Sequence, residues 1–182
     1  MSVRTVRGRF VWHELMTTDL DSSARFYTRV VGWEKQAWDQ DPSYRMFATG
    51  GVPMAGYMLL PEDARRMGAP PHWMTYIGTP DVDATAAQAE DLGARVLKSP
   101  TDIPNVGRFS VIQDPQGATF SAFTPNQPPP GDGKPSLGDF SWHELTTTDW
   151  PAALHFYHRL FGWEKAGSME MGPDIGTYQM FG

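Results

Sequence analysis

Apolar and polar positions in the first sixty residues alternate as in a strand, then follow a helical spacing, then alternate again. Residues 9–17 have the strand pattern, and the side-chain oxygen of Asp19 is placed to cap a helix. The helical spacing ends at Gly32 and comprises Leu20, Ala24, Tyr27 and Val31. Three more strands are expected at 33–40, 44–49 and 52–60. The predicted order of elements is therefore βαβββ.

Residues 71–124 show the same predicted order of strands and helix with a different amino-acid sequence. The stretch HWMTYIG predicts a strand, and Asp81 is placed to cap a helix over 82–92. A type I turn is expected at 114–117, which reads Asp-Pro-Gln-Gly. Three strands complete the unit at 94–99, 107–113 and 118–123. The chain is thus predicted to carry two tandem modules, at about 9–60 and 71–124.

A third copy of the pattern follows the second module. Residues 10–35 and 140–165 are identical at 15 of 26 aligned positions, at an offset of 130. The match resumes at 44–47, which aligns with 178–181. Residues 125–138 between the copies hold five prolines and three glycines, which is typical of a linker. We expect a complete domain at 1–124, this linker, and a partial second domain at 139–182.

The partial domain leads to two expectations. Twice the repeat offset predicts a fragment of a protein of about 260 residues. If the chain does end at Gly182, the apolar helix of the third copy has to pack on the first domain or on a partner chain. That helix carries Leu154, Phe156, Tyr157, Leu160 and Phe161.

Composition narrows the class of protein. Of the 182 residues, 40% are hydrophobic and 20% charged, and no apolar run approaches the length of a membrane span. The net charge of -6 and the scattered basic residues argue against nucleic acid as a partner. There are no cysteines, so a metal site has to use His, Asp or Glu. No secretory signal is recognisable, and a cytoplasmic location and small-molecule partners are expected.

The motifs resemble those of one superfamily. Asp19 opens the pattern D-x6-FY-x4-GW, and residues 102–121 read DIPNVGRFSVIQDPQGATFS. Both are similar to motifs of the vicinal oxygen chelate superfamily, which includes glyoxalase I, bleomycin-resistance proteins and extradiol dioxygenases. The likeness covers nearly the whole chain outside the linker, and it is greatest to the two-domain, glyoxalase-like group.

This resemblance implies an α+β fold in which tandem βαβββ modules enclose a shared cavity, followed here by an incomplete third module. In catalytic members a divalent metal is held by the first strand of each module and the last strand of the second. The substrate chelates the metal through adjacent oxygens. The sheets of such proteins often pair across chains, so a homodimer is one arrangement that the resemblance allows.

The usual ligands are absent from this chain. The positions that the resemblance assigns to the metal hold Trp12, Met74 and Ser121. We therefore expect neither a metal nor another cofactor, and a divalent metal would require a different strand register from the one assumed.

Glu14 is the candidate catalytic residue. Strand alternation places it on the cavity side of its strand with Trp12, near Met74 and Phe123. Burial among apolar groups raises the pKa of a carboxyl, which suits a general acid or base. The alternative is a partly solvated structural carboxylate paired with Arg45 or Arg108.

Other candidates have binding roles. His13 falls on the opposite face and is expected to be a hydrogen-bonded structural histidine. His72 is expected at the cavity rim, where it binds substrate, or holds a metal if the register slips by two; the alternative is a solvated histidine at the end of its strand. Tyr76, Thr119 and Ser121 offer hydroxyls to a ligand. A soft apolar lining is expected from Trp12, Met16, Met54, Met58, Met74 and Phe123.

Three functions remain open at this point. The first is a glyoxalase-like lyase or isomerase, or a dioxygenase relative, that acts on a small oxygenated metabolite while Glu14 moves a proton. The second is a metal-free binding protein of the bleomycin-resistance type. The third is a scaffold that mainly self-associates. The substrate cannot be chosen from the residues.

Overall fold

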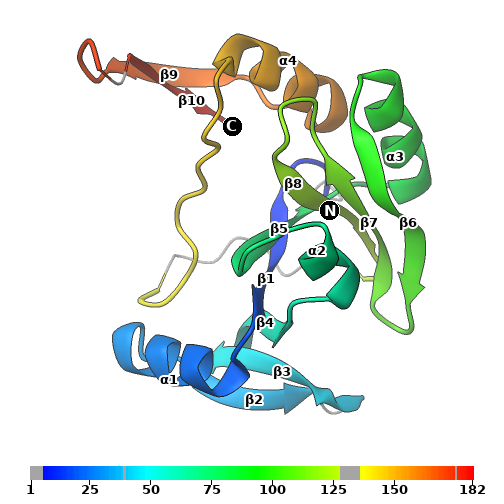
Figure 1. Cartoon of the computed structure of the whole chain (residues 1–182), viewed down its shortest axis with the longest axis vertical. Coiled ribbons are helices and arrows are strands. Elements are labelled where there is room, and N and C mark those ends of the chain that lie inside the picture. The colour runs from blue at the N-terminus through cyan, green and yellow to red at the C-terminus, as the bar shows by residue number, and fades with distance from the viewer. Residues whose placement is uncertain (1–5, 39, 128–135, 175) are drawn as a thin grey trace, which may run out of the picture. The chain divides into compact units, whose positions relative to one another are not determined.

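The computed structural model describes residues 6–38, 40–127, 136–174 and 176–182. The chain divides into two compact units. The module-1 unit comprises residues 10–76 and 130–143, and the module-2 unit comprises 1–9, 77–129 and 144–182. Both contain helices and strands, which confirms the α+β class (Figure 1).

The module-1 unit has the predicted βαβββ order. Its elements are β1 (Phe10–Thr17), α1 (Leu20–Val30), β2 (Glu34–Trp38), β3 (Asp41–Thr49) and β4 (Val52–Leu59). A short helix that the sequence did not predict, α2 (Glu62–Arg66), and the start of β5 (His72–Gly78) follow. The strands lie in the order β2-β3-β4-β1, in which β1 and β4 are parallel and the other pairs antiparallel.

Strand register in this unit sorts side chains to two faces as the alternation predicts. Leu15 lies opposite Tyr57 in the parallel pair, and both belong to the buried core beneath Ala24 of α1. Glu14 lies opposite Gly56 and Met16 opposite Met58, on the alternate positions of the same strands.

Met54 is an exception to the predicted faces. It packs against the core cluster around Leu15 rather than with Met58. The register of β3 against β4 shifts here, because Phe47 pairs with Ala55 and Ala48 pairs with Pro53. The extra residue of this bulge turns Met54 away from its expected face, so its predicted place in the pocket lining is wrong.

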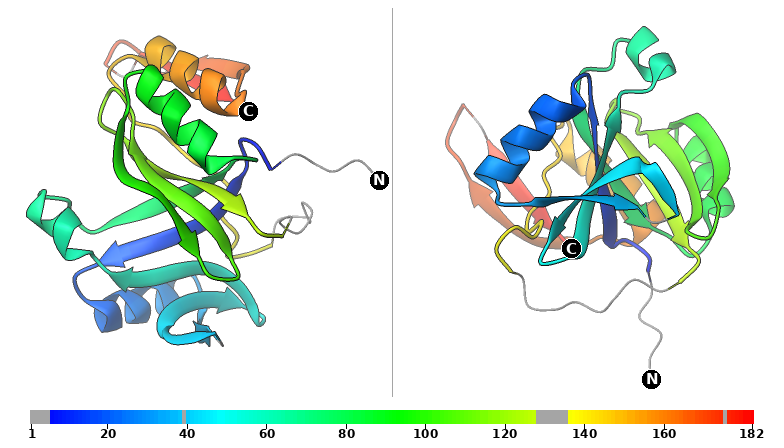
Figure 2. Two further views of the ribbon diagram at one scale, coloured as in Figure 1. Left: turned by 90° about the vertical axis from the view of Figure 1, so that its right-hand side faces the viewer. Right: turned by 90° about the horizontal axis from the view of Figure 1, so that it is seen from below.

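The module-2 unit contains a second antiparallel set of strands. Its elements are the last residues of β5, α3 (Val82–Asp91), β6 (Arg95–Ile103), β7 (Gly107–Gln113) and β8 (Thr119–Pro125), with strand order β8-β7-β6. The third copy adds α4 (Trp150–Phe161) and an antiparallel pair, β9 (Lys165–Glu170) and β10 (Thr177–Phe181). Figure 2 shows α4 beside α3.

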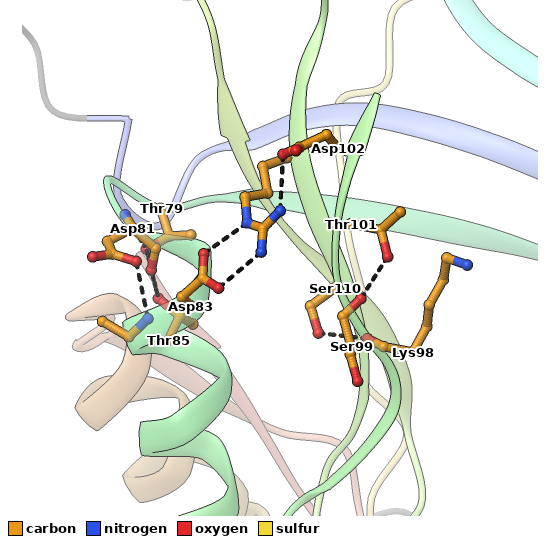
Figure 3. A network of polar contacts seen from close by, with 11 residues as sticks. Thr79, Asp81, Asp83, Thr85, Lys98, Ser99, Thr101, Asp102 and Ser110 are labelled. Atoms are coloured by element: carbon orange, nitrogen blue, oxygen red, sulfur yellow. Dashed lines mark hydrogen bonds and ion pairs between the residues drawn. The ribbon is translucent and has the colours of Figure 1, made fainter. Parts of the chain in front are cut away.

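One polar cap begins all three long helices. The carboxylates of Asp19, Asp81 and Asp149 each accept a hydrogen bond from the backbone N–H three residues on. In the second module the Thr79 hydroxyl also contacts that of Thr85 at 2.7 Å (Figure 3). The predicted helix starts are therefore confirmed.

Arg108 on β7 joins α3 to the neighbouring strand at the surface. Its Nε and Nη2 donate to the two carboxylate oxygens of Asp83 at 2.7 and 3.0 Å, and its Nη1 donates to Asp102 at 2.9 Å. Figure 3 also shows the Ser110 hydroxyl donating to the carbonyl of Lys98, where the register of β6 against β7 is irregular. These contacts satisfy polar groups that the irregular pairing leaves open.

The third copy differs from the first at its opening strand. Residues 142–145 read Trp-His-Glu-Leu (the WHEL motif), as residues 12–15 of β1 do, yet no strand forms over 140–148. Within the part of the chain that the structure describes, no strand pairs with them as β4 pairs with β1. The predicted linker, 125–138, lies largely outside the described residues, and the division into domains stays a prediction.

The helix of the third copy is covered within the module-2 unit. The Phe120 ring of β8 lies 5.6 Å from the ring of Tyr157 and 5.7 Å from that of Phe161. The Tyr157 hydroxyl donates to Asp114 at 3.0 Å. The apolar face of α4 is thus covered, as the sequence predicts it must be.

No helix among the described residues is long and apolar enough to cross a membrane.

Candidate functional site

Glu14 is a buried carboxyl held by two tyrosines. It lies on β1 with 4% of its surface exposed. The Tyr44 hydroxyl of β3 donates to its Oε1 at 2.6 Å, and the Tyr76 hydroxyl of β5 donates to its Oε2 at 2.9 Å. Each carboxyl oxygen therefore has a phenolic donor, and burial on the predicted face is confirmed.

The predicted arginine partners of Glu14 are wrong. Arg45 pairs instead with Asp21 at 3.5 Å, on the surface of the same unit. Arg108 is engaged by Asp83 and Asp102. Glu14 is thus surrounded by neutral hydrogen-bond donors rather than by a cation.

A third aromatic side chain extends the network. The indole nitrogen of Trp12 donates to the Tyr44 hydroxyl at 3.2 Å, so that hydroxyl accepts one hydrogen bond while it donates another to Glu14. A hydroxyl that both accepts and donates is fixed in direction. Trp12, predicted as a binding residue, therefore orients Tyr44.

Gly56 provides the space for this network. A methyl group at Gly56 would collide with the Tyr44 hydroxyl, and would lie 2.7 Å from the ring carbon that carries it. The same methyl group would lie 3.1 Å from Oε1 of Glu14. The strand pairing that sets Gly56 opposite Glu14 is thus also what lets the tyrosine reach the carboxyl.

Burial controls the protonation of the group. It raises the pKa of the Glu14 carboxyl, and the hydrogen bonds from Tyr44 and Tyr76 offset only part of that effect. Burial and the neighbouring Glu14 also raise the pKa of Tyr44, so this phenol keeps its proton and acts as a donor. The site is therefore a carboxyl that exchanges a proton closer to neutrality than an exposed glutamate does.

His72 and Met74 belong to the same unit but to different surroundings. Nδ1 of His72 lies 2.7 Å from the carbonyl oxygen of Pro70. His72 also borders an open groove of about 370 Å³ that is lined by Leu15, Thr17, Ser22, Ser23, Phe26, Tyr27, Pro71 and Trp73. Met74 is buried, with 3% exposure. The predicted binding roles of both residues remain predictions.

The remaining predicted site residues lie in the module-2 unit, on β8. Thr119 is exposed, whereas Ser121 and Phe123 are buried. The Ser121 hydroxyl is fully buried and has no hydrogen-bond partner among the residues that the structure describes. The site candidates fall in two different compact units, and the shared cavity stays a prediction.

The side chains at the three positions that the resemblance assigns to the metal do not fit a divalent cation. The Trp12 indole nitrogen is a hydrogen donor without a free lone pair, and it is engaged by Tyr44. Met74 offers a thioether and Ser121 a neutral hydroxyl, neither of which is a usual ligand of hard divalent metals. Residues 6–38, 40–127, 136–174 and 176–182 hold no cluster of three or more His, Asp or Glu able to bind a metal ion.

His13 forms an unexpected pair with its counterpart in the third copy. Its Nε2 lies 2.6 Å from Nε2 of His143, and its ring stacks on Phe140 at 3.7 Å between centroids. Phe10 stacks reciprocally on His143 at 3.6 Å. Burial and then the neighbouring His143 lower the pKa of His13 to about 3. The prediction of a hydrogen-bonded structural histidine is confirmed.

Sequence reasoning missed Tyr44, Gly56 and the His143 partner. A signal for the tyrosine existed, because it recurs in the third copy as Tyr178. There its hydroxyl donates to Glu144 at 2.7 Å, so the third copy kept both members of the pair. Comparing the copies for pairs of residues would have singled out the contact.

The chain is similar to known proteins in sequence. Residues 9–121 match the family model of the Glyoxalase/Bleomycin resistance protein/Dioxygenase superfamily. Proteins named "Putative glyoxylase CFP32" from Mycobacterium bovis and Mycobacterium tuberculosis are 40% identical over 120 residues, which is 65% of this chain and 44% of theirs. The Streptomyces anthracycline biosynthesis protein DauV is 29% identical over 182 residues, covering 93% of this chain and 66% of its own. The matches thus span about half to two thirds of these relatives.

Solved structures share the fold at low sequence identity. The Mn(II)-bound glyoxalase from Novosphingobium aromaticivorans aligns with a TM-score of 0.59 and 18% identity, over 89% of this chain and 54% of that one. A mutant of 4-hydroxymandelate synthase from Streptomyces coelicolor aligns with a TM-score of 0.63 and 16% identity, over 96% and 58%. With the family model matched over most of both modules, the chain belongs to the Glyoxalase/Bleomycin resistance protein/Dioxygenase superfamily, also called the vicinal oxygen chelate superfamily.

Proposed function

We propose that the chain is a glyoxalase-like enzyme that moves a proton on a small oxygenated metabolite, with Glu14 as the acid and base. The observation that carries this proposal is the buried Glu14 carboxyl with its raised pKa and its two phenolic donors. A general base is most effective when its pKa lies near the working pH. The mycobacterial relatives are named as glyoxylases, which supports the same class of substrate.

The proposed step is proton abstraction next to a carbonyl group. The Glu14 carboxylate takes the proton from carbon, and the electron pair of the broken C–H bond moves onto the carbonyl oxygen, giving an enolate. Where the α-carbon carries a hydroxyl, the hydroxyl proton passes to the enolate oxygen and protonated Glu14 returns its proton to the former carbonyl carbon, which gives the isomeric hydroxycarbonyl compound. Return of the proton to the same carbon restores the substrate, with its α-hydrogen exchanged if the Glu14 proton has exchanged with solvent. An ionised carboxylate has about four acceptor sites, so two remain after Tyr44 and Tyr76 are bonded.

The tyrosines can stabilise the enolate. A developing oxyanion is best stabilised by donors that are already fixed in direction, because no reorganisation is then needed during the reaction. Tyr44 is fixed by Trp12, and both tyrosine hydroxyls lie within hydrogen-bond reach of the Glu14 carboxyl. When Glu14 takes the proton, its carboxyl becomes a weaker acceptor, so an enolate oxygen lying beside it competes for the same two hydrogens without a change in the direction of either hydroxyl.

Solvent deuterium exchange tests the proposed step. The protein is incubated in D2O with a panel of small α-hydroxycarbonyl and α-dicarbonyl compounds, and proton NMR follows exchange of the α-hydrogen. We expect exchange with the native chain and a loss of about 100-fold or more in Glu14→Gln, the range typical of a lost general base. Glu34→Gln, on the exposed part of β2, is the matched control and should exchange as the native chain does. Equal rates in Glu14→Gln and the native chain would refute the proposal.

Metal-free binding of a flat aromatic compound is the second candidate. The relative DauV is named as an anthracycline biosynthesis protein, and Trp12 and the buried Met16 and Met74 give this chain apolar side chains suited to such a ligand. Titration with an anthraquinone, followed by tryptophan fluorescence, tests it. Tight binding that Glu14→Gln leaves intact, with no α-hydrogen exchange in the native chain, would favour binding over catalysis. A homodimer and a cytoplasmic location stay predictions.

A further inference from the structure

The two copies of one helix differ in how their apolar faces are covered. Phe26 and Val30 on α1 are 56% and 65% exposed. Their counterparts on α4, at the repeat offset of 130, are Phe156 and Leu160, with 4% and 2% exposure. Since the two faces have similar chemistry, the cover of α4 indicates what α1 lacks.

The cover of α4 comes from the end of the second module. Phe120 on β8 packs against the α4 aromatic residues, with its ring 6.5 Å from that of Phe156. The turn at 114–117 lies at the start of the helix, where the Gln116 side chain donates to the carbonyl of Asp149 at 2.8 Å and accepts from its N–H at 3.2 Å. Asp114 of the same turn accepts from Tyr157.

The residues around α1 include the counterparts of those that contact this turn on α4. Gln116 of this turn also accepts a hydrogen bond from the hydroxyl of Thr147, which belongs to the third copy. The counterparts of Thr147 and Tyr157 are Thr17 and Tyr27, and both line the open groove of about 370 Å³ in the module-1 unit. The Tyr27 hydroxyl accepts from Trp73 at 2.8 Å, which leaves its own hydrogen to be donated, as Tyr157 donates to Asp114.

We propose that the face of α1 formed by Phe26, Tyr27 and Val30 is a docking surface for another module of the 71–124 kind. The partner module carries an Asp-Pro-x-Gly turn followed by an aromatic strand residue. The aspartate of that turn accepts a hydrogen bond from the Tyr27 hydroxyl, and the aromatic residue packs against the α1 face. The mycobacterial relatives are more than twice as long as the stretch they share with this chain, which leaves room for such a module. On this view α1 and α4 are interchangeable occupants of the same kind of module face.

Cysteine cross-linking between two full-length chains tests the docking, since the native chain has no cysteine. One chain carries Thr18→Cys, at the counterpart of Thr148, whose hydroxyl lies 3.3 Å from Gln116. The other carries Gln116→Cys and Phe156→Asp, so that α4 leaves its place and the module face becomes available. We expect a mixed disulfide between the two chains, at a yield at least tenfold above that obtained when the second chain keeps Phe156.

Two matched controls make the result decisive. Adding Phe26→Asp to the first chain should abolish the cross-link, and moving its cysteine to the exposed Val52 should also abolish it. Phe156→Ala is a milder change that should keep a native-like circular dichroism spectrum and give an intermediate cross-linking yield. It therefore tests the docking even if the Phe156→Asp chain misfolds. A cross-link that persists with Phe26→Asp, or one that forms equally from position 52, would overturn the proposal.

Discussion

At the scale of single residues, the environment of Glu14 leads to a prediction about stability and pH. The folded pKa of this carboxyl lies above its ordinary value of 4.5, so the folded chain holds the proton longer than the unfolded chain does. Burying the charge therefore costs nothing below about pH 4.5, and it lowers stability as the pH rises through the folded pKa. Glu14→Gln removes this penalty. The difference between the Tm of Glu14→Gln and the Tm of the native chain should therefore increase, in favour of the variant, as the pH is raised from 5 to 8.

Calorimetry over that pH range checks this expectation, with Glu34→Gln as the exposed control. A Tm difference between Glu14→Gln and the native chain that stays constant with pH would show that the carboxyl is not buried as an acid. This measurement is independent of turnover, so it tests the site even before a substrate is known.

Gly56 offers a second prediction at this scale. Gly56→Ala pushes the Tyr44 ring away from Glu14, and overpacking of this kind costs about 1–3 kcal/mol of unfolding free energy. The double variant Gly56→Ala/Tyr44→Ala should be nearly as stable as Tyr44→Ala alone, because the methyl group then meets no ring. Urea denaturation of the four proteins gives the coupling energy. Strict additivity of the two changes would contradict the predicted collision.

The sequence could predict Glu14 but not its partners. Alternation along β1 is enough to place Glu14 and Leu15 on opposite faces, because the period of a strand is fixed. Tyr44 reaches Glu14 only through the register of β3 on β4 and of β4 on β1, which depends on hairpin geometry and a bulge. Arg45 adjoins Tyr44 in sequence, but its side chain is at the surface beside Asp21.

At the scale of elements, the docking of α4 depends on one buried polar contact. Asp114 is 5% exposed, and it accepts from two backbone N–H groups of its own turn and from the Tyr157 hydroxyl. Tyr157→Phe leaves one acceptor of this carboxyl unpaired, which should cost about 1–3 kcal/mol. Tyr178→Phe, whose partner Glu144 is exposed to water, should cost less. Chemical denaturation of both variants compares them, and equal costs would count against an anchoring role for Asp114.

The two copies of the WHEL motif show how far a strand can be predicted from its own amino-acid sequence. Both copies share strand-like alternation, and only the first forms a strand, since β1 has β4 to pair with and residues 140–148 have no such partner among the described residues. The helices were predicted more closely, because their hydrogen bonds and their aspartate caps are local. The short α2 has no side-chain cap bond and gave no such signal.

At the scale of the whole molecule, the two histidines connect repeats that lie 130 residues apart in sequence. Each histidine is stacked on the phenylalanine of the other copy, so the contact is reciprocal, as at a two-fold interface. One ring donates and the other accepts, which requires that at least one of them be neutral.

This pair predicts a loss of stability in acid. The folded pKa of His13, about 3, lies below its ordinary value of 6.5, so the unfolded chain takes up the proton first as the pH falls. The contribution of the neutral pair is therefore complete above pH 6.5 and declines as the pH falls toward 3, by about a few kcal/mol at pH 4. The double variant His13→Gln/His143→Gln should be less stable at pH 7.5 and should lose less on acidification. Thermal unfolding at several pH values measures both, and parallel curves would rule the pair out as the cause.

Each of the two compact units is built from separate stretches of the sequence, and this limits how the protein can be shortened. The chain passes from one unit to the other after residues 9, 76, 129 and 143, so neither unit is a continuous stretch of sequence. A protein cut after residue 124 would lose Phe140 from the core around Trp33 and α4 from its place on Phe120. Expression boundaries chosen from the repeats alone would thus expose apolar surface in both units at once, and the shortened protein should aggregate more than the 182-residue chain does, which light scattering of both proteins measures.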